Sequence, residues 1–114
     1  MKYALLIYAD PASFTELPED EAKAITAEYF ALRDEAGFID GARLAPAHAA
    51  TTVRVNGGGA LTTDGPFADT KEVFGGYYIF EADNLDRALE LASRVPAARM
   101  GGAVEVRPVE DLTS

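Results

Sequence analysis

Short apolar segments separated by polar turns predict the strands of a sheet. Residues 2–9 form a continuous apolar and aromatic run that ends at Asp10-Pro11, which is typical of a buried strand. Residues 51–55 alternate and are rich in β-branched side chains, and the turn at 56–59 returns the chain through 60–63 as a hairpin. Further strands are expected at 38–45, with a bulge at Gly41, at 77–82, and at 105–109, with Pro108 at a sheet edge or strand end.

Two other segments repeat apolar residues at helical spacing. The first begins at Pro18, carries acids in its first turn and is expected to end at Gly37. The second begins after Asn84, a good N-cap, and ends before Pro96. Residues 10–18 are expected to form a loop with room for one helical turn. The apolar positions of the first helix are Ala22, Ile25, Tyr29, Leu32 and Ala36.

The order of these elements is strand, helix, strand, hairpin, strand, helix and strand. An antiparallel sheet with two helices on one face is an α+β arrangement, and here it predicts the ferredoxin-like fold, a split βαβ unit repeated twice. We expect a single domain over residues 1–114, because length and a hydrophobic content of 48% are those of one globular unit. The two helices leave the other sheet face uncovered, so we expect a homodimer through that face.

The charge of the chain excludes several classes of partner. Asp and Glu number 19 against 10 Lys and Arg, which gives a net charge of −9 and a pI of about 4.4. A duplex, an RNA or an anionic membrane surface would meet net repulsion, so we expect no direct binding to nucleic acid and no membrane association. The N-terminal apolar run is too short for a signal peptide or a membrane span, and we expect a soluble, cytoplasmic protein.

The chain has few residues that could bind a metal ion or supply a thiol. It has no cysteine and one histidine, His48, which excludes thiolate sites and a multi-histidine metal site within one chain. We expect no metal and no cofactor. His48 would be either a general base or a half-exposed imidazole in a loop, and the second interpretation is favoured because no acid or second histidine lies nearby at ligand spacing.

The segment 64–72, DGPFADTKE, holds the densest cluster of chemical groups. In one interpretation it presents Asp64, Thr70, Lys71 and Glu72 to a pocket, where they would bind a polar ligand or act as acids and bases. In the other it is a self-satisfied turn between strands, which the local sequence favours. Tyr8, on the first strand, would be part of a ligand pocket or, as is more usual for such aromatics, of a core or dimer interface.

The same segment predicts a local geometry. Pro66 fixes φ and has no N–H donor, so we expect Asp64 to cap the turn of its own loop. Residues 69–72 can form one helical turn. We expect Lys71 and Glu72 to lie near the mouth of a cleft between the sheet and the first helix.

Several segments together resemble one family. They are MKYALLIY at 1–8, ATTVRVNGG at 50–58, TDGPFADTKEVFGGYYIFEADNLDRALE at 63–90 and EVRPV at 105–109. In order and spacing they are similar to the DGPF-domain proteins of the YCII-related family. The resemblance implies a small bacterial protein with the dimeric α+β-barrel version of the ferredoxin-like fold, and a functional link to extracytoplasmic-function sigma factors.

The resemblance also bears on catalysis. The wider YCII-like group has a proposed catalytic histidine in its first helix and an aspartate in a late DPF motif, and these fall near Thr26 and Val95 of this chain. Neither residue carries the needed group, and His48 lies in a different region. These differences count against transferring an enzyme activity from that group.

Three functions from different classes stay open. In the first, the chain is a dimer that binds a small polar or aromatic ligand or has a regulatory role. In the second, it is an isomerase or lyase in which Asp64 is the base and Lys71 stabilises an oxyanion or enolate, with His48 as a further catalytic candidate. In the third, it is an interaction module without a ligand. An acid with a raised pKa in a pocket would favour the enzyme hypothesis. A sealed cleft would favour the interaction module.

Overall fold

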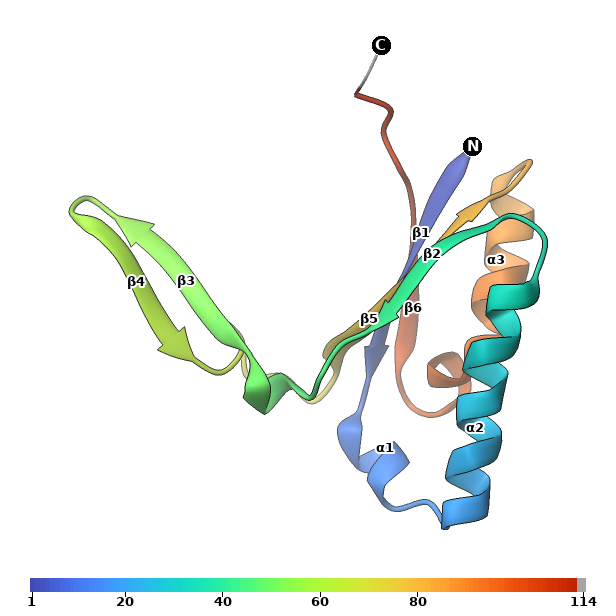
Figure 1. Ribbon diagram of the computed structural model, residues 1–114, viewed down its shortest axis with the longest axis horizontal. Coiled ribbons are helices and arrows are strands. Elements are labelled where there is room, and N and C mark those ends of the chain that lie inside the picture. The colour runs from blue at the N-terminus through green and yellow to red at the C-terminus, as the bar shows by residue number, and fades with distance from the viewer. Residues whose placement is uncertain (113–114) are drawn as a thin grey trace.

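The computed structural model describes residues 1–112, which form a four-stranded antiparallel sheet of order β2-β5-β1-β6 and a two-stranded sheet, β3-β4 (Figure 1). The strands are β1 (Lys2–Ala9), β2 (Phe38–Arg43), β3 (Thr51–Asn56), β4 (Gly59–Asp64), β5 (Val73–Glu81) and β6 (Ala103–Pro108). The α-helices are α1 (Pro11–Thr15), α2 (Glu19–Ala31) and α3 (Leu85–Ser93). Short 3-10 turns are η1 (Leu32–Asp34), η2 (Ala47–Ala49) and η3 (Pro96–Arg99).

The larger sheet has the ferredoxin-like order, and the expected α+β class is confirmed. Both α2 and α3 lie on one face of this sheet (Figure 1). The β3-β4 hairpin is an insertion between the second and third strands of the sheet along the chain. Pro108 lies in β6, an edge strand, as the missing N–H of proline requires.

The hydrophobic core lies between the sheet and its helices, because alternate side chains of the central strands point toward them. Leu5 of β1, Phe80 of β5 and Leu91 of α3 are fully buried. Burial of one such side chain contributes roughly 1.5–3 kcal/mol to folding. Tyr78 shares the face of Phe80, whereas Tyr77 lies on the opposite face, as strand alternation predicts. The core is completed by Tyr3, Ile7, Leu32, Tyr78, Ala82, Ala88, Ala92, Val95 and Ala97.

The two longer helices are held in different ways. Asn84 caps α3 as expected, because its Oδ1 accepts a hydrogen bond from the Arg87 N–H at 3.0 Å. α3 buries side chains in the core, whereas no residue of α2 is buried and its N-cap, Pro18, makes no side-chain cap. Within residues 1–112, no helix has the length and hydropathy needed to cross a bilayer.

The first helix ends earlier than the apolar repeat predicts. α2 stops at Ala31, η1 carries the chain to Asp34, and Ala36 is exposed. Gly37, with φ of 92°, packs against the backbone of Glu81, and its carbonyl accepts a hydrogen bond from the Glu81 N–H at 2.7 Å. The chain has to leave the helix before this contact, so the buried positions of the repeat end at Leu32.

The position of the bulge in β2 also differs from the position expected from the sequence. The register with β5 shifts between Phe38 and Asp40, so the bulge lies before Gly41 and not at it. Gly41 instead gives room to the ring of Tyr78, since a Cβ at Gly41 would lie 3.0 Å from Tyr78 Cδ1. The strand ends at Arg43 and not at Ala45, because the chain then turns into η2.

We call the β3-β4 hairpin, residues 51–64, the arm. It projects from the rest of the molecule on the side opposite α2 and α3 (Figure 1), and its strands pair only with each other. The expected strands and turn are confirmed. The radius of gyration is 16.1 Å, whereas a compact domain of this length has about 13 Å.

A hydrogen bond ties α2 to the sheet. The Tyr78 hydroxyl donates to the Tyr29 carbonyl at 2.6 Å. Burial, helped by the neighbouring Tyr29 phenol, raises the pKa of Tyr78 from its ordinary value of 10 to about 12. The phenol therefore remains a donor up to high pH.

The Tyr78→Phe variant should show how much this hydrogen bond stabilises the fold. The folded state favours the neutral phenol, so this contribution is complete below pH 10 and is lost as the pH rises toward 12. We expect the variant to lose about 1 kcal/mol of unfolding free energy at pH 7. Its free energy should also fall less steeply between pH 10 and 12 than that of the wild type. Urea unfolding followed by circular dichroism measures both, and parallel pH curves would contradict the account.

Two adjacent glycines of β5 provide a matched pair. A Cβ at Gly76 would lie 2.6 Å from the Ala42 carbonyl oxygen of β2, whereas a Cβ at Gly75 meets no atom within 4 Å. We expect Gly76→Ala to lower the unfolding free energy by about 1–3 kcal/mol, because the two strand backbones must separate. Gly75→Ala should change it by less than about 1 kcal/mol. Equal effects in urea titrations would show that the close approach of β2 and β5 is not what requires glycine.

Candidate functional site

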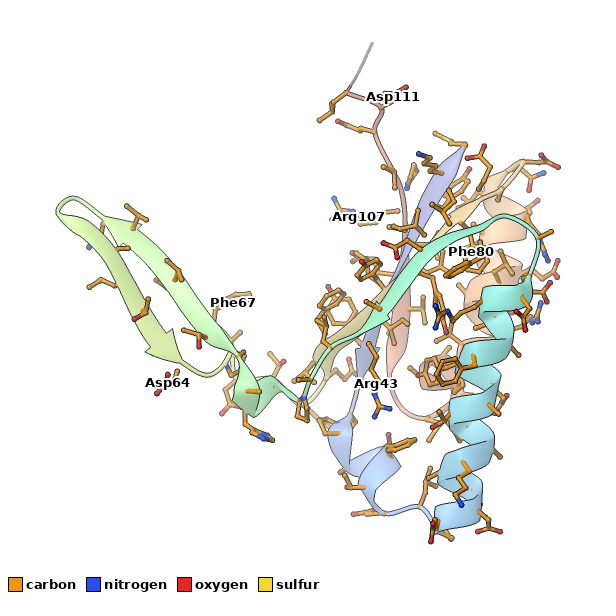
Figure 2. All side chains as sticks on the ribbon, in the orientation of Figure 1. Arg43, Asp64, Phe67, Phe80, Arg107 and Asp111 are labelled. Atoms are coloured by element: carbon orange, nitrogen blue, oxygen red, sulfur yellow. The ribbon has the colours of Figure 1, made fainter. Side chains whose placement is uncertain are left out.

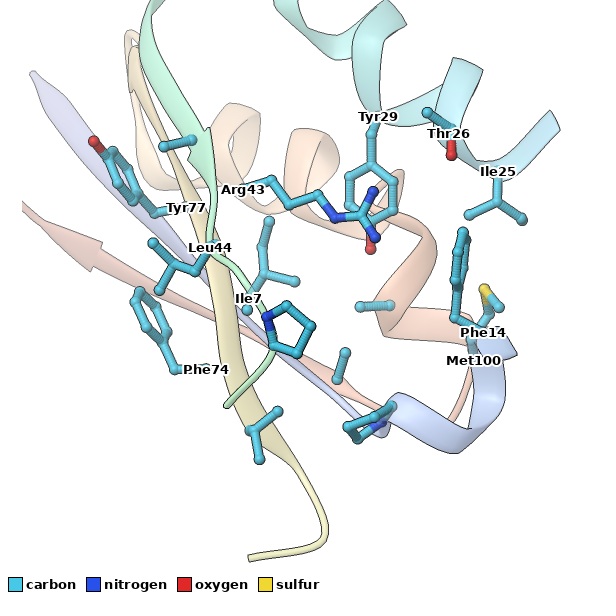
Figure 3. A pocket seen from close by; sticks show the side chains of 18 of the residues that line it. Ile7, Phe14, Ile25, Thr26, Tyr29, Arg43, Leu44, Phe74, Tyr77 and Met100 are labelled. Carbon is cyan, nitrogen blue, oxygen red and sulfur yellow. The ribbon is translucent and has the colours of Figure 1, made fainter. Parts of the chain in front are cut away.

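An open cleft of about 670 Å³ lies between α2 and the end of the sheet where β2, β5 and α1 meet (Figure 3). It lies between the sheet and the first long helix, where the sequence predicts a cleft. Its wall is mostly apolar and aromatic, with contributions from Ile7, Phe14, Ile25, Tyr29, Ala97 and Met100.

Local sequence explains which side chains reach the cleft. Ile25 and Tyr29 are four residues apart and therefore share one face of α2. Asp10 is the N-cap of α1, and its Oδ1 accepts a hydrogen bond from the Ala12 N–H at 3.0 Å. This capped turn folds the chain after β1 so that Phe14 closes one end of the cleft (Figure 3).

Two arginines, Arg33 and Arg43, line the cleft, and Arg43 is the one that lies beside Phe14. It is the last residue of β2, and its side chain extends toward Tyr29 of α2 (Figure 3). The guanidinium carbon lies 5.5 Å from the centre of the Phe14 ring, which is cation–π geometry. Among residues 1–112, no carboxylate forms an ion pair with Arg43, whereas Arg94 pairs with Glu35 and Arg99 with Glu28.

Two tyrosines add hydroxyl groups to the wall. Burial raises the pKa of the Tyr29 phenol, against a hydrogen bond with the Ala97 backbone and the positive charge of Arg43, which lower it. The phenol of Tyr78 is also protonated and is already committed to the Tyr29 carbonyl. At neutral pH these groups are hydrogen-bond donors and not bases.

Thr26, near which the resemblance places the histidine of the wider YCII-like group, lies in the cleft, and its Oγ1 donates to the Ala22 carbonyl at 3.0 Å within α2. Val95, near which the resemblance places the aspartate, is fully buried in the core. Neither side chain can transfer a proton to or from a bound molecule.

Among residues 1–112, the lining of the cleft includes one carboxylate, that of Asp10. Its Oδ1 caps α1, and its Oδ2 lies 4.0 Å from Lys71 Nζ. In the part of the chain that the structure describes, no group of three or more His, Asp or Glu side chains could hold a metal ion. The charged groups of the cleft are therefore suited to binding an anion through arginine.

Asp64 lies away from this cleft. It is the last residue of the arm, and its exposed carboxylate has no hydrogen bond or ion pair within residues 1–112 (Figure 2). The predicted cap is wrong, because other groups hold the turn. The Gly65 N–H donates to the Ala50 carbonyl at 2.7 Å, and Thr52 Oγ1 donates to the Gly65 carbonyl at 2.8 Å.

The rest of segment 64–72 is irregular, and the helical turn expected at 69–72 does not form. Thr70 Oγ1 donates to the Glu72 carbonyl at 2.6 Å, and both residues are exposed. Lys71 reaches the rim of the cleft through its contact with Asp10. A ligand-binding role for Thr70, Lys71 and Glu72 stays a prediction.

The two remaining candidates lie near the cleft but do not line it. His48 is exposed in η2, next to Ala47, which does contribute to the wall. Tyr8 lies on the opposite side of the sheet, where its ring packs 5.5 Å from that of Phe74. Any role of His48 or Tyr8 in binding also stays a prediction.

Arg43, Phe14 and the α2 side chains are not predicted from the sequence as parts of one site. One signal was available, because Arg43 is the only charged residue between Asp40 and Arg54. The nearest carboxylate along the chain, that of Asp40, accepts a hydrogen bond from the Tyr77 hydroxyl at 3.2 Å and forms no ion pair with Arg43. Its position beside Phe14 and Tyr29 depends on chain segments that are distant in sequence.

Two comparisons place the chain among known proteins. An uncharacterised protein of Rhizobium meliloti (strain 1021) is 36% identical over 114 residues, which cover 96% of this chain and 92% of that protein. A solved structure of 5-chloro-2-hydroxyhydroquinone dehydrochlorinase from Burkholderia phenoliruptrix AC1100, in complex with 2,5-dihydroxybenzoquinone, matches with a TM-score of 0.53. The match covers 96% of this chain and 94% of the other, and at 19% identity it establishes the shared fold.

The sequence pattern of one family spans almost the whole chain. The family model of the YCII-related domain matches residues 1–113, which include β1, the arm and β6. The resemblance seen in the DGPF segment is therefore confirmed, and the chain belongs to the YCII-related domain family.

Proposed function

We propose that the cleft binds a small planar molecule that carries an anionic group, such as an aromatic carboxylate or an ionised phenol. The observation that carries this proposal is Arg43, a guanidinium without a carboxylate partner in residues 1–112, held beside Phe14 in an apolar wall. A guanidinium offers five N–H donors in a plane, which match the two oxygens of a carboxylate or of neighbouring ring hydroxyls.

The remaining wall suits the ring of such a ligand. Phe14, Ile25 and Tyr29 provide an apolar surface on which an aromatic ring can pack. A volume of about 670 Å³ falls in the range of about 300–1,000 Å³ that small-molecule sites occupy. An open cleft of this size also favours a ligand over the third hypothesis, an interaction module without one.

The structural neighbour supports the ligand class. The dehydrochlorinase holds 2,5-dihydroxybenzoquinone, which is a planar six-membered ring with acidic hydroxyl groups. That compound combines the two properties that Arg43 and the aromatic wall select. We therefore propose a ligand of this chemical kind for the present chain.

An enzyme is the second candidate, because the neighbour is a dehydrochlorinase and the cleft contains one carboxylate. Asp10, whose side chain is 22% exposed, would be the acid or base of an isomerase or lyase acting on the same ligand. Binding alone is favoured, because one oxygen of Asp10 is committed to the cap of α1 and the described residues that line the cleft include no histidine. Chloride release from 5-chloro-2-hydroxyhydroquinone that Asp10→Asn abolishes would favour the enzyme instead.

We also propose that two copies of the chain associate through the outer face of the sheet, the face that α2 and α3 do not cover. Leu6, Tyr77 and Ile79 are half-buried residues of this face in a single chain. The chain exposes 7813 Å², whereas a compact monomer of 12.1 kDa exposes roughly 6,000 Å². This excess is large enough to include the area that one subunit of a stable homodimer buries, about 1,000 Å² or more.

The cytoplasmic location and the functional link to extracytoplasmic-function sigma factors stay predictions. The second of these rests on the family resemblance. If the link exists, a ligand-binding dimer with a net charge of −9 per chain would act through a protein or a small molecule and not by binding DNA.

Arg43→Gln tests the ligand proposal. Isothermal titration with 2,5-dihydroxybenzoquinone, benzoate and salicylate should show saturable binding of at least one of them by the wild type. The variant should lose at least tenfold in affinity, because a hydrogen bond to a charged group contributes about 1.5–3 kcal/mol. Arg54→Gln, on the arm, is the matched control and should bind like the wild type.

A neutral ligand distinguishes the contribution of the ligand's charge from the contribution of its shape. 2,5-Dimethoxybenzoquinone keeps the ring and lacks the acidic hydroxyls, so Arg43→Gln should leave its weaker binding unchanged. The proposal fails if the wild type binds none of the three anions, or if Arg43→Gln binds them as tightly as the wild type does.

Ile79→Lys tests the association of two chains. Ile79 lies on the outer face of the central strand β5, so a lysine there would place a charge in the middle of the interface. Sedimentation velocity at micromolar concentration should show a dimer for the wild type and a monomer for the variant. Leu89→Lys, on the exposed side of α3, should remain a dimer. A monomeric wild type would refute the proposal.

A further inference from the structure

The strands of the arm have no other element of the described chain to pack on. Within residues 1–112, β3 and β4 pair only with each other, and their apolar side chains point into solvent. Val55 is 79% exposed, and Val53 and Leu61 are each 60% exposed. An isolated two-stranded hairpin is at best marginally stable in water and needs a further strand or surface to pack on. Some surface outside a single chain is therefore needed to cover the arm.

One face of the arm is better suited to packing than the other. Val53 pairs with Thr62 and Val55 with Ala60, and strand alternation places these four residues on one face, which we call the valine face. The other face carries Arg54, whose charge favours water. The two pairs of the valine face carry no charge, and the next pair on the same side, Thr51–Asp64, places its carboxylate at the base of the arm, where it can remain in water.

The position of the arm selects a second copy of this chain as the surface that covers it. The arm leaves the molecule on the side opposite α2 and α3, which is the side of the outer sheet face (Figure 1). A copy seated on that face would lie beside the arm, and two-fold symmetry would bring its own arm to the first chain. The arm is therefore continuous with the interface proposed above.

The charge of the arm and the exposed surface area of the chain are both consistent with a second copy as the partner of the arm. The arm contains one cation, Arg54, and one anion, Asp64, so it is neutral in a chain of net charge −9 and avoids repulsion from a second copy. The surface of 7813 Å² exceeds that of a compact monomer by roughly 1,800 Å², more than the roughly 800 Å² per partner of a standard interface. An arm that also packs on the partner accounts for this large excess.

We propose that the valine face of each arm docks on the other copy when two chains associate through their outer sheet faces. This inference rests on the proposed dimer and adds a second area of contact to it. The dimer can form without the arm, so the two proposals can fail separately.

Hydrogen exchange of the full chain, followed by mass spectrometry, tests the docking. Peptides from residues 51–64 should exchange at least tenfold more slowly in the associated wild type than in the monomeric Ile79→Lys variant. The double variant Val53→Thr/Val55→Thr keeps β-branched side chains and hence strand propensity. It should lose this protection and dissociate at least tenfold more readily in sedimentation equilibrium. Leu61→Thr, on the other face of the arm, is the control and should change dissociation less than twofold.

Each other outcome overturns a stated part of the account. An associated wild type whose arm exchanges as fast as that of Ile79→Lys refutes the docking and leaves the sheet-face dimer. Equal slow exchange in both proteins means that the arm packs on its own chain, which also refutes it. A wild type that does not associate at any concentration refutes both the dimer and the docking.

Discussion

The alternation of side chains along β1 and β5 is the constraint on which the rest of this structure depends. A strand presents successive residues to opposite faces, and two helices can cover only one face of a four-stranded sheet. Leu5 and Phe80 therefore lie in the core with α3, whereas Leu6 and Ile79 lie on the outer face. The core explains why a chain of this size folds, and the outer face explains why we propose that it associates with a second copy.

The cleft follows from an imbalance between the two helices. α3 buries Ala88, Leu91 and Ala92 and packs closely, whereas no residue of α2 is buried. The side chains of α2 that face the sheet, such as Tyr29, consequently border an open space. Arg43 enters this space from β2 beside the ring of Phe14, and within residues 1–112 it forms no ion pair with a carboxylate. A loosely packed helix beside an unpaired cation is the physical basis for the proposed ligand.

The sequence predicts the elements well, because each has local signals. The apolar run at 2–9, the cap at Asn84 and the glycine-rich turn of the arm all appear where expected. Predictions failed where a distant contact overrides a local signal. The end of α2 is set by the packing of Gly37 on the backbone of Glu81, and the turn after Asp64 is held by Ala50 and Thr52.

The candidate site was less accessible to sequence analysis than the fold. Its parts come from α1, α2, β2 and β5, and only the tertiary structure brings Phe14 to Arg43. The polar groups of segment 64–72 are adjacent in sequence, yet among them only Lys71 reaches the rim of the cleft, through Asp10. Groups that are adjacent in sequence therefore do not all converge on the cleft of this structure.

A crystal structure of the chain grown with 2,5-dihydroxybenzoquinone tests the central claim most directly. The account predicts the ring in the cleft between α2 and β2, packed on Phe14 or Tyr29, with a ring oxygen at hydrogen-bond distance from the Arg43 guanidinium. A ring bound outside this cleft, or an Arg43 side chain paired with a carboxylate of the protein while the cleft holds no ligand, would contradict it.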